Sequence, residues 1–82
     1  MIEEQAVREK LRRWIVEHAK RPAKDLTDET RILDEGIVSS LDIVELVLYI
    51  ESLRGTEVDT EDIDPEVFTS VNTLYQAFFR AA

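Results

Sequence analysis

The sequence contains no cysteine, only two glycines and two prolines, and few aromatic residues, which make up 7% of its 82 residues. Without cysteine, the fold has no disulfide, and the chain offers neither a thiolate metal ligand nor a cysteine nucleophile. No hydrophobic run approaches the roughly 20 residues that cross a bilayer, so we expect no membrane insertion. The first residues lack the basic and then apolar regions of a signal peptide, so we expect a cytoplasmic protein.

The net charge of −8 is unevenly distributed along the chain. Residues 1–24 hold seven Lys/Arg and four Asp/Glu, a net of +3, whereas residues 25–82 hold three and fourteen, a net of −11. A field this negative repels phosphates and argues against a nucleic-acid partner. It favours encounter with partners that carry basic patches, although acidity that only keeps a small protein soluble is the plainer alternative.

Helical periodicity and its stop signals divide the chain into elements. Apolar residues at helical spacing predict an amphipathic helix over residues 3–20, which Pro22 ends. A second helix is expected over residues 40–54, with Gly55 as its left-handed C-terminal cap. Asp64 and Pro65 begin a short helical turn, and Ser70 caps a last helix over residues 71–80.

No strand pattern, repeat or second domain accompanies these elements. The sequence therefore predicts one all-α domain over residues 1–82, a small bundle of three main helices plus one short helix. Between the first two helices lies a long loop over residues 21–39, whose apolar residues should pack over the core. A loop of this length in a compact domain is usually functional. A monomer is the expected state.

The helix expected over residues 40–54 is more apolar than one core requires. A helical wheel predicts a core-facing side (Ile43, Leu46, Val47, Ile50, Leu53) and an opposite, polar side (Asp42, Glu45, Tyr49, Ser52). Leu41, Val44 and Leu48 form a further apolar flank, edged by Glu45 and Glu51. The flank either packs under the long loop or forms a docking strip for a hydrophobic groove flanked by Lys/Arg.

Two serines stand where this helix begins. Ser39 and Ser40 end the loop, and serine is favoured at a helix N-cap because its oxygen accepts a hydrogen bond from a free backbone N–H. The same helix end carries partial positive charge and suits a phosphate ester. A serine hydroxyl here is therefore either a cap or an attachment point for a phosphate-linked group.

The run from Asp34 to Glu51, with Gly36-Ile37-Val38-Ser39-Ser40-Leu41 at its centre, resembles the acyl carrier protein family. The four-residue step from Gly36 to Ser40 is similar to that of D-alanyl carriers and of other free-standing aminoacyl or peptidyl-type carriers. The segment Ile63-Asp64-Pro65-Glu66-Val67-Phe68 resembles the short-helix segment of D-alanyl carriers. Ser39 departs from the family, because an aspartate usually stands there and helps a basic transferase surface recognise the site. Arg54 also departs, at a position where the family often has a large apolar residue.

The resemblance implies an acyl-carrier-like fold and a carrier without a catalytic group of its own. A phosphopantetheinyl transferase would attach 4′-phosphopantetheine from coenzyme A to Ser40, with Ser39 as an adjacent cap or recognition residue. An acyl- or aminoacyl-loading ligase and downstream transferases with basic docking surfaces would then contact a partner-binding set (Leu41, Asp42, Val44, Glu45, Leu48, Glu51). The Gly36–Ser40 spacing favours aminoacyl or short polar cargo, and fatty acyl and polyketide units stay open.

Three other interpretations compete with a carrier. A serine hydrolase needs a base, and the single histidine, His18, falls on the apolar face of the first helix, where it is usually a packed residue. The acidic run Asp59 to Glu66 lacks the turn glycine and terminal glutamate of an EF-hand, so a solvated loop is favoured over a metal site. The serious rival is a cofactor-free acidic helical interaction module on the same fold, with Ser40 only a cap.

Overall fold

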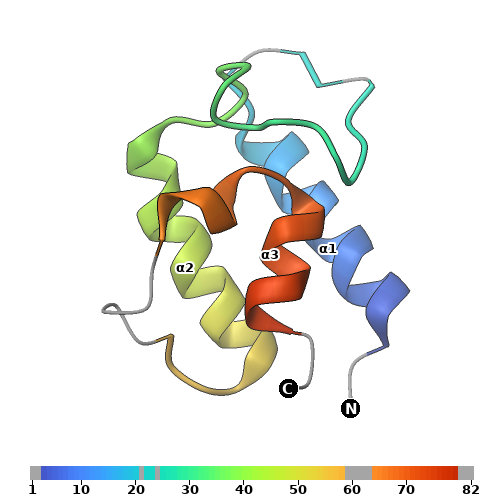
Figure 1. Cartoon of the computed structure of the whole chain (residues 1–82), viewed down its shortest axis with the longest axis vertical. Helices are drawn as coiled ribbons and strands as arrows, with labels where there is room; N and C mark the ends of the chain where they lie inside the picture. Colours follow the sequence, from blue (N-terminus) through green and yellow to red (C-terminus); the bar gives the residue numbers. More distant parts are fainter. Residues whose placement is uncertain (1–2, 21, 24, 59–63, 80–82) are drawn as a thin grey trace.

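The computed structural model describes residues 3–20, 22–23, 25–58 and 64–79, and within them every regular element is helical. Helix α1 runs over Glu4–His18, α2 over Ser40–Arg54, the 3-10 helix η2 over Pro65–Phe68, and α3 over Val71–Phe78. The three main helices pack side by side, with the long loop closing one end of the bundle (Figure 1). The prediction of an all-α chain with three main helices and one short one is confirmed for this part of the chain.

Local sequence signals explain most of the helix ends. Gly55 adopts φ 77°, the left-handed conformation expected after the last turn of α2. Asp64 Oδ1 accepts a hydrogen bond from the Glu66 N–H at 3.0 Å, and Pro65 is the first residue of η2. Helix α1 ends at His18 rather than at residue 20, because Ala19 is already extended and the Lys20 N–H donates to Ile37 O at 2.7 Å. Helix α3 ends at Phe78, and Arg80 lies outside the described residues.

The core draws on all the helices and on the long loop. Ile32, Ile37 and Val38 of the loop are at most 5% exposed, so the expectation that this loop packs over the core is confirmed. Helix α3 lies against both α1 and η2. The remaining buried hydrophobic residues are Val7, Leu11, Trp14, Ile15, Leu46, Ile50, Val58, Phe68, Val71 and Leu74.

One part of the helical wheel for α2 is wrong. Asp42 and Tyr49 were expected on the polar side, but Asp42 is 8% exposed and Tyr49 is half-buried, with its ring 6.1 Å from that of Trp14. At about 100° per residue, both lie within about 60° of the buried Leu46, so they share its side of the helix. Ile43, Val47 and Leu53, which were assigned to the core side, are half-buried and pack against the core.

None of the helices in the described part of the chain combines the length and apolar character needed to cross a bilayer.

Candidate functional site at the start of α2

The two serines at the start of α2 have different environments. Ser39 is the N-cap residue, with extended backbone angles, and both its N–H and its hydroxyl donate to Asp42 Oδ2, at 2.9 and 3.1 Å. A side chain at the third helical position that reaches back to the cap N–H is the arrangement of a capping box. Ser40, the first residue of the helix, is exposed. The hydroxyl of Ser39 is therefore engaged in capping, whereas Ser40 is exposed.

The carboxylate of Asp42 is the centre of this cap. Hydrogen bonds from the Ser39 N–H and hydroxyl, together with the charge of Lys20, lower the pKa of Asp42 below its ordinary value, against the opposing effect of burial. Lys20 Nζ lies 3.7 Å from Asp42 Oδ1 and links the end of α1 to the start of α2. Asp42 was expected in the partner-binding set. That expectation is corrected, because the carboxylate is turned inward and is held by the chain itself.

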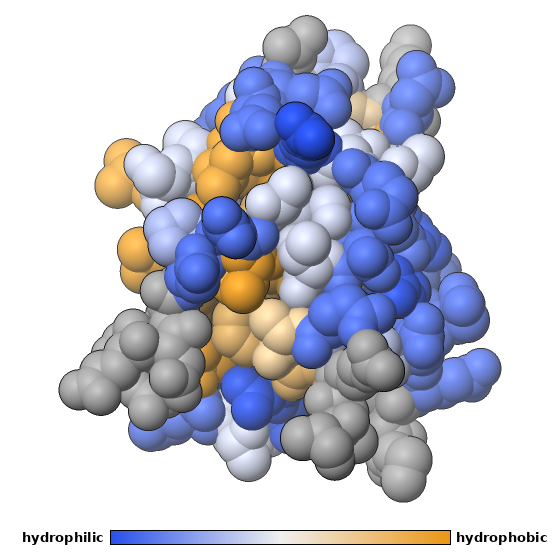
Figure 2. Space-filling model, viewed as in Figure 1, coloured by the Kyte–Doolittle hydropathy of each residue, from blue (hydrophilic) through white to orange (hydrophobic). Residues whose placement is uncertain are grey.

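The apolar flank of α2 is open to solvent. Leu41, Val44 and Leu48 are 81%, 64% and 61% exposed, so they do not pack under the long loop. We call these three residues the α2 strip. In the space-filling view, hydrophobic residues gather over the side where α2 lies, whereas hydrophilic residues cover the α1 side (Figure 2). The first residue of the strip follows Ser40 directly, so a hydroxyl and an apolar surface lie together.

Two glutamates, Glu45 and Glu51, flank the α2 strip in different environments. Glu45 is exposed and adds a negative charge beside Leu41 and Leu48. Glu51 is half-buried, and its Oε2 accepts a hydrogen bond from the Val58 N–H at 2.8 Å. Glu51 therefore anchors the chain that follows α2, in addition to its expected place at the edge of the docking surface. A substitution of Glu51 would disturb this anchor as well as the surface charge.

The residues that were considered for a hydrolase or a metal site either have structural roles or lie outside the described residues. His18 stacks on Trp14 with ring centroids 3.8 Å apart, and its Nδ1 lies 2.9 Å from the Trp14 carbonyl oxygen, so the ring is a packing element of α1. No group of three or more His, Asp or Glu side chains in the described ranges is arranged to hold a metal ion. Asp59, Glu61 and Asp62 of the acidic run, and Ile63 of the family-like segment, lie outside those ranges.

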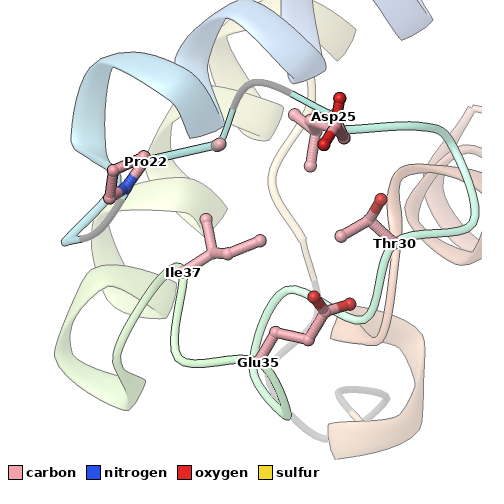
Figure 3. Close-up of a pocket in the computed structure, with 7 residues that line it drawn as sticks. Pro22, Asp25, Thr30, Glu35 and Ile37 are labelled. Atoms are coloured by element: carbon pink, nitrogen blue, oxygen red, sulfur yellow. The ribbon is translucent and has the colours of Figure 1, made fainter.

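A hollow of about 400 Å³ lies beside the long loop (Figure 3). Ile37 points into it, and Asp25 and Glu35 stand on different sides of its rim (Figure 3). Ile37 precedes Ser40 by three residues, so its Cα is at most about 11 Å from that of Ser40. The segment that lines the hollow thus continues into the site. Its full lining is Pro22, Ala23, Asp25, Leu26, Thr30, Glu35 and Ile37.

Sequence reasoning missed the residues that support the site from behind. The spacing Ser39-x-x-Asp42 matches a capping box and could have shown that Asp42 turns inward. Nothing in the sequence pattern predicted the contact between Lys20 and Asp42, because it joins the segment that follows α1 to the first turn of α2. No known protein-family model matches the chain. The likeness to acyl carriers therefore rests on the quoted residues alone.

Proposed function

We propose that this chain is a free-standing carrier protein that bears 4′-phosphopantetheine on Ser40 and presents an acyl or aminoacyl group to partner enzymes. The observation that carries the proposal is the contrast between the two serines. Ser40 is exposed at the first position of α2, whereas the Ser39 hydroxyl donates to Asp42 at 3.1 Å. An attachment site needs a hydroxyl that a second enzyme can reach, and of these two only that of Ser40 is exposed and uncommitted to the cap.

The residues around Ser40 fit a phosphate diester. Free N–H groups and the positive end of the helix dipole favour an anion at the start of a helix. Ser40 acts as a substrate: its oxygen forms a bond to the phosphorus of coenzyme A, the diphosphate bond breaks, 3′,5′-ADP leaves, and the transferase takes the serine proton. The attached arm supplies the thiol on which cargo is held as a thioester. Because the chain has no cysteine, that thiol has no competitor within the protein.

The α2 strip is the proposed docking surface for the transferase, the loading ligase and downstream enzymes. Leu41, Val44 and Leu48 would enter a hydrophobic groove, and Glu45 would face its basic rim. The surplus of fourteen Asp/Glu over three Lys/Arg in residues 25–82 would speed encounter with such basic surfaces. A flexible tether then raises the concentration of the cargo at each active site. The step of four residues from Gly36 to Ser40 favours aminoacyl or short polar cargo.

The test is the intact mass of the protein after incubation with coenzyme A and a broad-specificity phosphopantetheinyl transferase. We expect one added phosphopantetheine on the wild-type chain and on Ser39→Ala, and none on Ser40→Ala. Ser52→Ala is the matched control, because Ser52 is an exposed serine of the same helix. Addition to Ser40→Ala but not to Ser39→Ala would move the site by one residue. No addition with several transferases would favour a cofactor-free interaction module built on the same α2 strip.

A further inference from the structure

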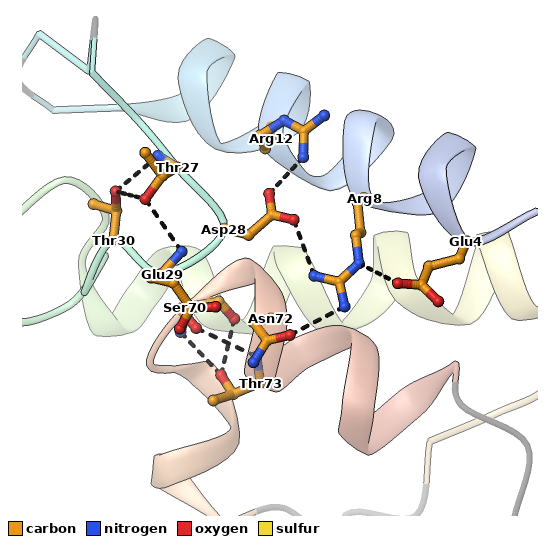
Figure 4. A network of polar contacts seen from close by, with 10 residues as sticks. All are labelled: Glu4, Arg8, Arg12, Thr27, Asp28, Glu29, Thr30, Ser70, Asn72 and Thr73. Carbon is orange, nitrogen blue, oxygen red and sulfur yellow. Dashed lines mark hydrogen bonds and ion pairs between the residues drawn. The ribbon is translucent and has the colours of Figure 1, made fainter.

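A buried arginine joins three parts of the fold at one point. Arg8 of α1 is 8% exposed, and its guanidinium donates to Glu4 Oε2 at 2.9 Å, to Asp28 Oδ2 at 2.9 Å and to Asn72 Oδ1 at 3.0 Å. The Asn72 N–H in turn donates to the backbone oxygen of Asp28 at 2.8 Å. Arg8, Asp28 and Asn72 thus form a closed ring between α1, the long loop and α3, which we call the Arg8 ring (Figure 4).

The ring is reinforced on both sides. Arg12, one turn further along α1, donates to the other carboxylate oxygen of Asp28. The guanidinium carbon of Arg8 also lies 4.7 Å from the centre of the Tyr75 ring on α3. Burial alone lowers the pKa of Arg8, but its hydrogen bonds and charge interactions with Glu4 and Asp28 raise that pKa overall. Arg8 is therefore a fixed charge whose removal would leave Asp28 with its contact to Arg12 and would take away the donor to Asn72 Oδ1.

The loop continues from the ring to the start of α2 through a short series of backbone hydrogen bonds. The Ile32 N–H donates to Thr69 O at 2.9 Å, just before α3. Ile32 O accepts from the N–H groups of Ile37 and Val38, at 3.0 and 3.1 Å. Val38 directly precedes Ser39. The loop is thus tied to the start of α3 at Asp28 and at Ile32, and its last residues are tied to Ile32.

We propose that Arg8 is a positioning residue for Ser40. It acts through the Arg8 ring, which holds the long loop against α3 and so fixes the segment that places Ser39 and Ser40 at the start of α2. The role in modification rests on the proposed function of Ser40, whereas the role in ordering the loop does not. A 14-residue segment without helix or strand, from residue 25 to residue 38, loses much conformational freedom when it is ordered. With the ring intact, that loss has already occurred before a transferase binds, so docking does not have to order the loop.

The experiment compares Arg8→Met with Arg13→Met. Both substitutions remove an arginine of α1, but Arg13 is exposed, and its contact with Glu9 at 3.3 Å lies on the helix surface. Hydrogen exchange at the N–H groups of Ile32, Ile37 and Val38 should be at least about tenfold faster in Arg8→Met than in Arg13→Met. The amides of Leu46 and Ile50 in α2 should exchange at the same rate in both variants.

Kinetics of modification provide the second measurement. In Arg8→Met the KM of the transferase for this protein should rise about three- to tenfold, with kcat unchanged, because the loop must be ordered on docking. General unfolding would also raise KM, so the rise counts for positioning only where the amides of Leu46 and Ile50 exchange as in Arg13→Met. Asn72→Ala removes one member of the ring while retaining the contact between Arg8 and Asp28, so it should give a smaller effect of the same kind if Arg8→Met does not fold.

Each outcome has a defined meaning. The proposal that Arg8 orders the loop would be overturned if the loop amides exchanged at the same rate in Arg8→Met and Arg13→Met. It would also be overturned if Arg8→Met accelerated hydrogen exchange equally in the loop and in α2. Normal KM in Arg8→Met, with a wild-type chain that is modified, would overturn the positioning role alone. A wild-type chain that is not modified would overturn the function of Ser40 and its positioning together, and the exchange comparison would still decide the role of the ring in the loop.

Discussion

The two sides of helix α2 contrast in how their groups are used. On the inward side, Asp42 is held by Ser39 and Lys20, and Leu46 is fully buried. On the outward side, the serine at the first position and the three residues of the α2 strip face solvent. One helix thus has an inward side that is buried within the fold and an outward side that is largely exposed.

The two sides of α2 differ in what they contribute to the stability of the fold. A polar side chain that is buried must be paired, and the cap at Ser39 and Asp42 meets that requirement. Leu41, Val44 and Leu48 are not part of the hydrophobic core, and contiguous exposed apolar surface usually marks an interaction site. Substitutions on the inward side should therefore act on stability, and substitutions on the outward side should act on modification and docking.

The largest effect on stability should come from Leu46. Leu46→Ala removes a fully buried side chain and should lower the free energy of unfolding by about 2–5 kcal/mol. Leu48→Ala makes the same change at a side chain that is 61% exposed. This substitution should alter the free energy of unfolding by less than about 0.5 kcal/mol. Urea denaturation of both variants measures the difference. Equal destabilisation by the two substitutions would mean that the outward side is part of the core.

Docking should depend on the α2 strip. Replacing Leu41 and Leu48 together by serine should weaken binding of the phosphopantetheinyl transferase about tenfold, which corresponds to about 1.4 kcal/mol. Val16→Ser is the control, because Val16 is 51% exposed but lies on α1. Glu45→Lys should weaken binding more at low salt than at high salt, since salt screens exposed charges. Binding that is equal in the strip variant and in Val16→Ser would place the docking surface elsewhere.

The neighbouring serines should differ in stability as well as in modification. Ser39→Ala removes the hydroxyl that donates to Asp42 and disrupts the cap, so it should cost about 1 kcal/mol. Ser40→Ala should change the free energy of unfolding by less than about 0.5 kcal/mol, because the side chain is exposed. Thermal unfolding followed by circular dichroism compares them. A larger loss in Ser40→Ala than in Ser39→Ala would show that the cap has been assigned to the wrong residue.

The smallest effect should be a pH dependence that arises from Asp42. Its folded-state pKa is lowered, chiefly by the hydrogen bond from the Ser39 N–H, below the ordinary value of 3.8. The stabilisation from its carboxylate is therefore complete well above pH 3.8 and is lost as the pH falls through the lower, folded-state pKa. The advantage of the wild type over Asp42→Asn in urea should shrink below about pH 4. An advantage that stays constant down to pH 2 would exclude this role.

The sequence predicted the helices well because their ends depend on local chemistry. Ser39, Gly55 and Pro65 stand at the ends of helices where capping and backbone preferences place them, and α2 begins and ends where expected. The exposure of the α2 strip was one of two alternatives that periodicity left open. The structure decided between them because the long loop packs its own apolar residues, such as Ile32 and Ile37, into the core and does not cover the strip.

The tertiary contacts that hold the start of α2 in place could not be predicted from local sequence signals. The Arg8 ring joins residues 20 and 64 positions apart from Arg8, and an arginine in an amphipathic helix is usually solvated. The contact between Lys20 and Asp42 joins residues 22 positions apart, and no local sequence signal indicates it. Both are tertiary effects. These contacts determine how the start of α2 is held, whereas the sequence motif around Ser39 and Ser40 indicates only that a serine begins the helix.

The most direct test of the central claim is to locate the added group on the peptide that contains both serines. Trypsin should release residues 32–54 as one peptide, since Arg31 and Arg54 bound a segment without lysine or further internal arginine. After incubation with coenzyme A and a phosphopantetheinyl transferase, fragmentation of this peptide should assign phosphopantetheine to Ser40 and leave Ser39 unmodified. Fragments that carry the group on Ser39, or a peptide that is never modified, would contradict the account.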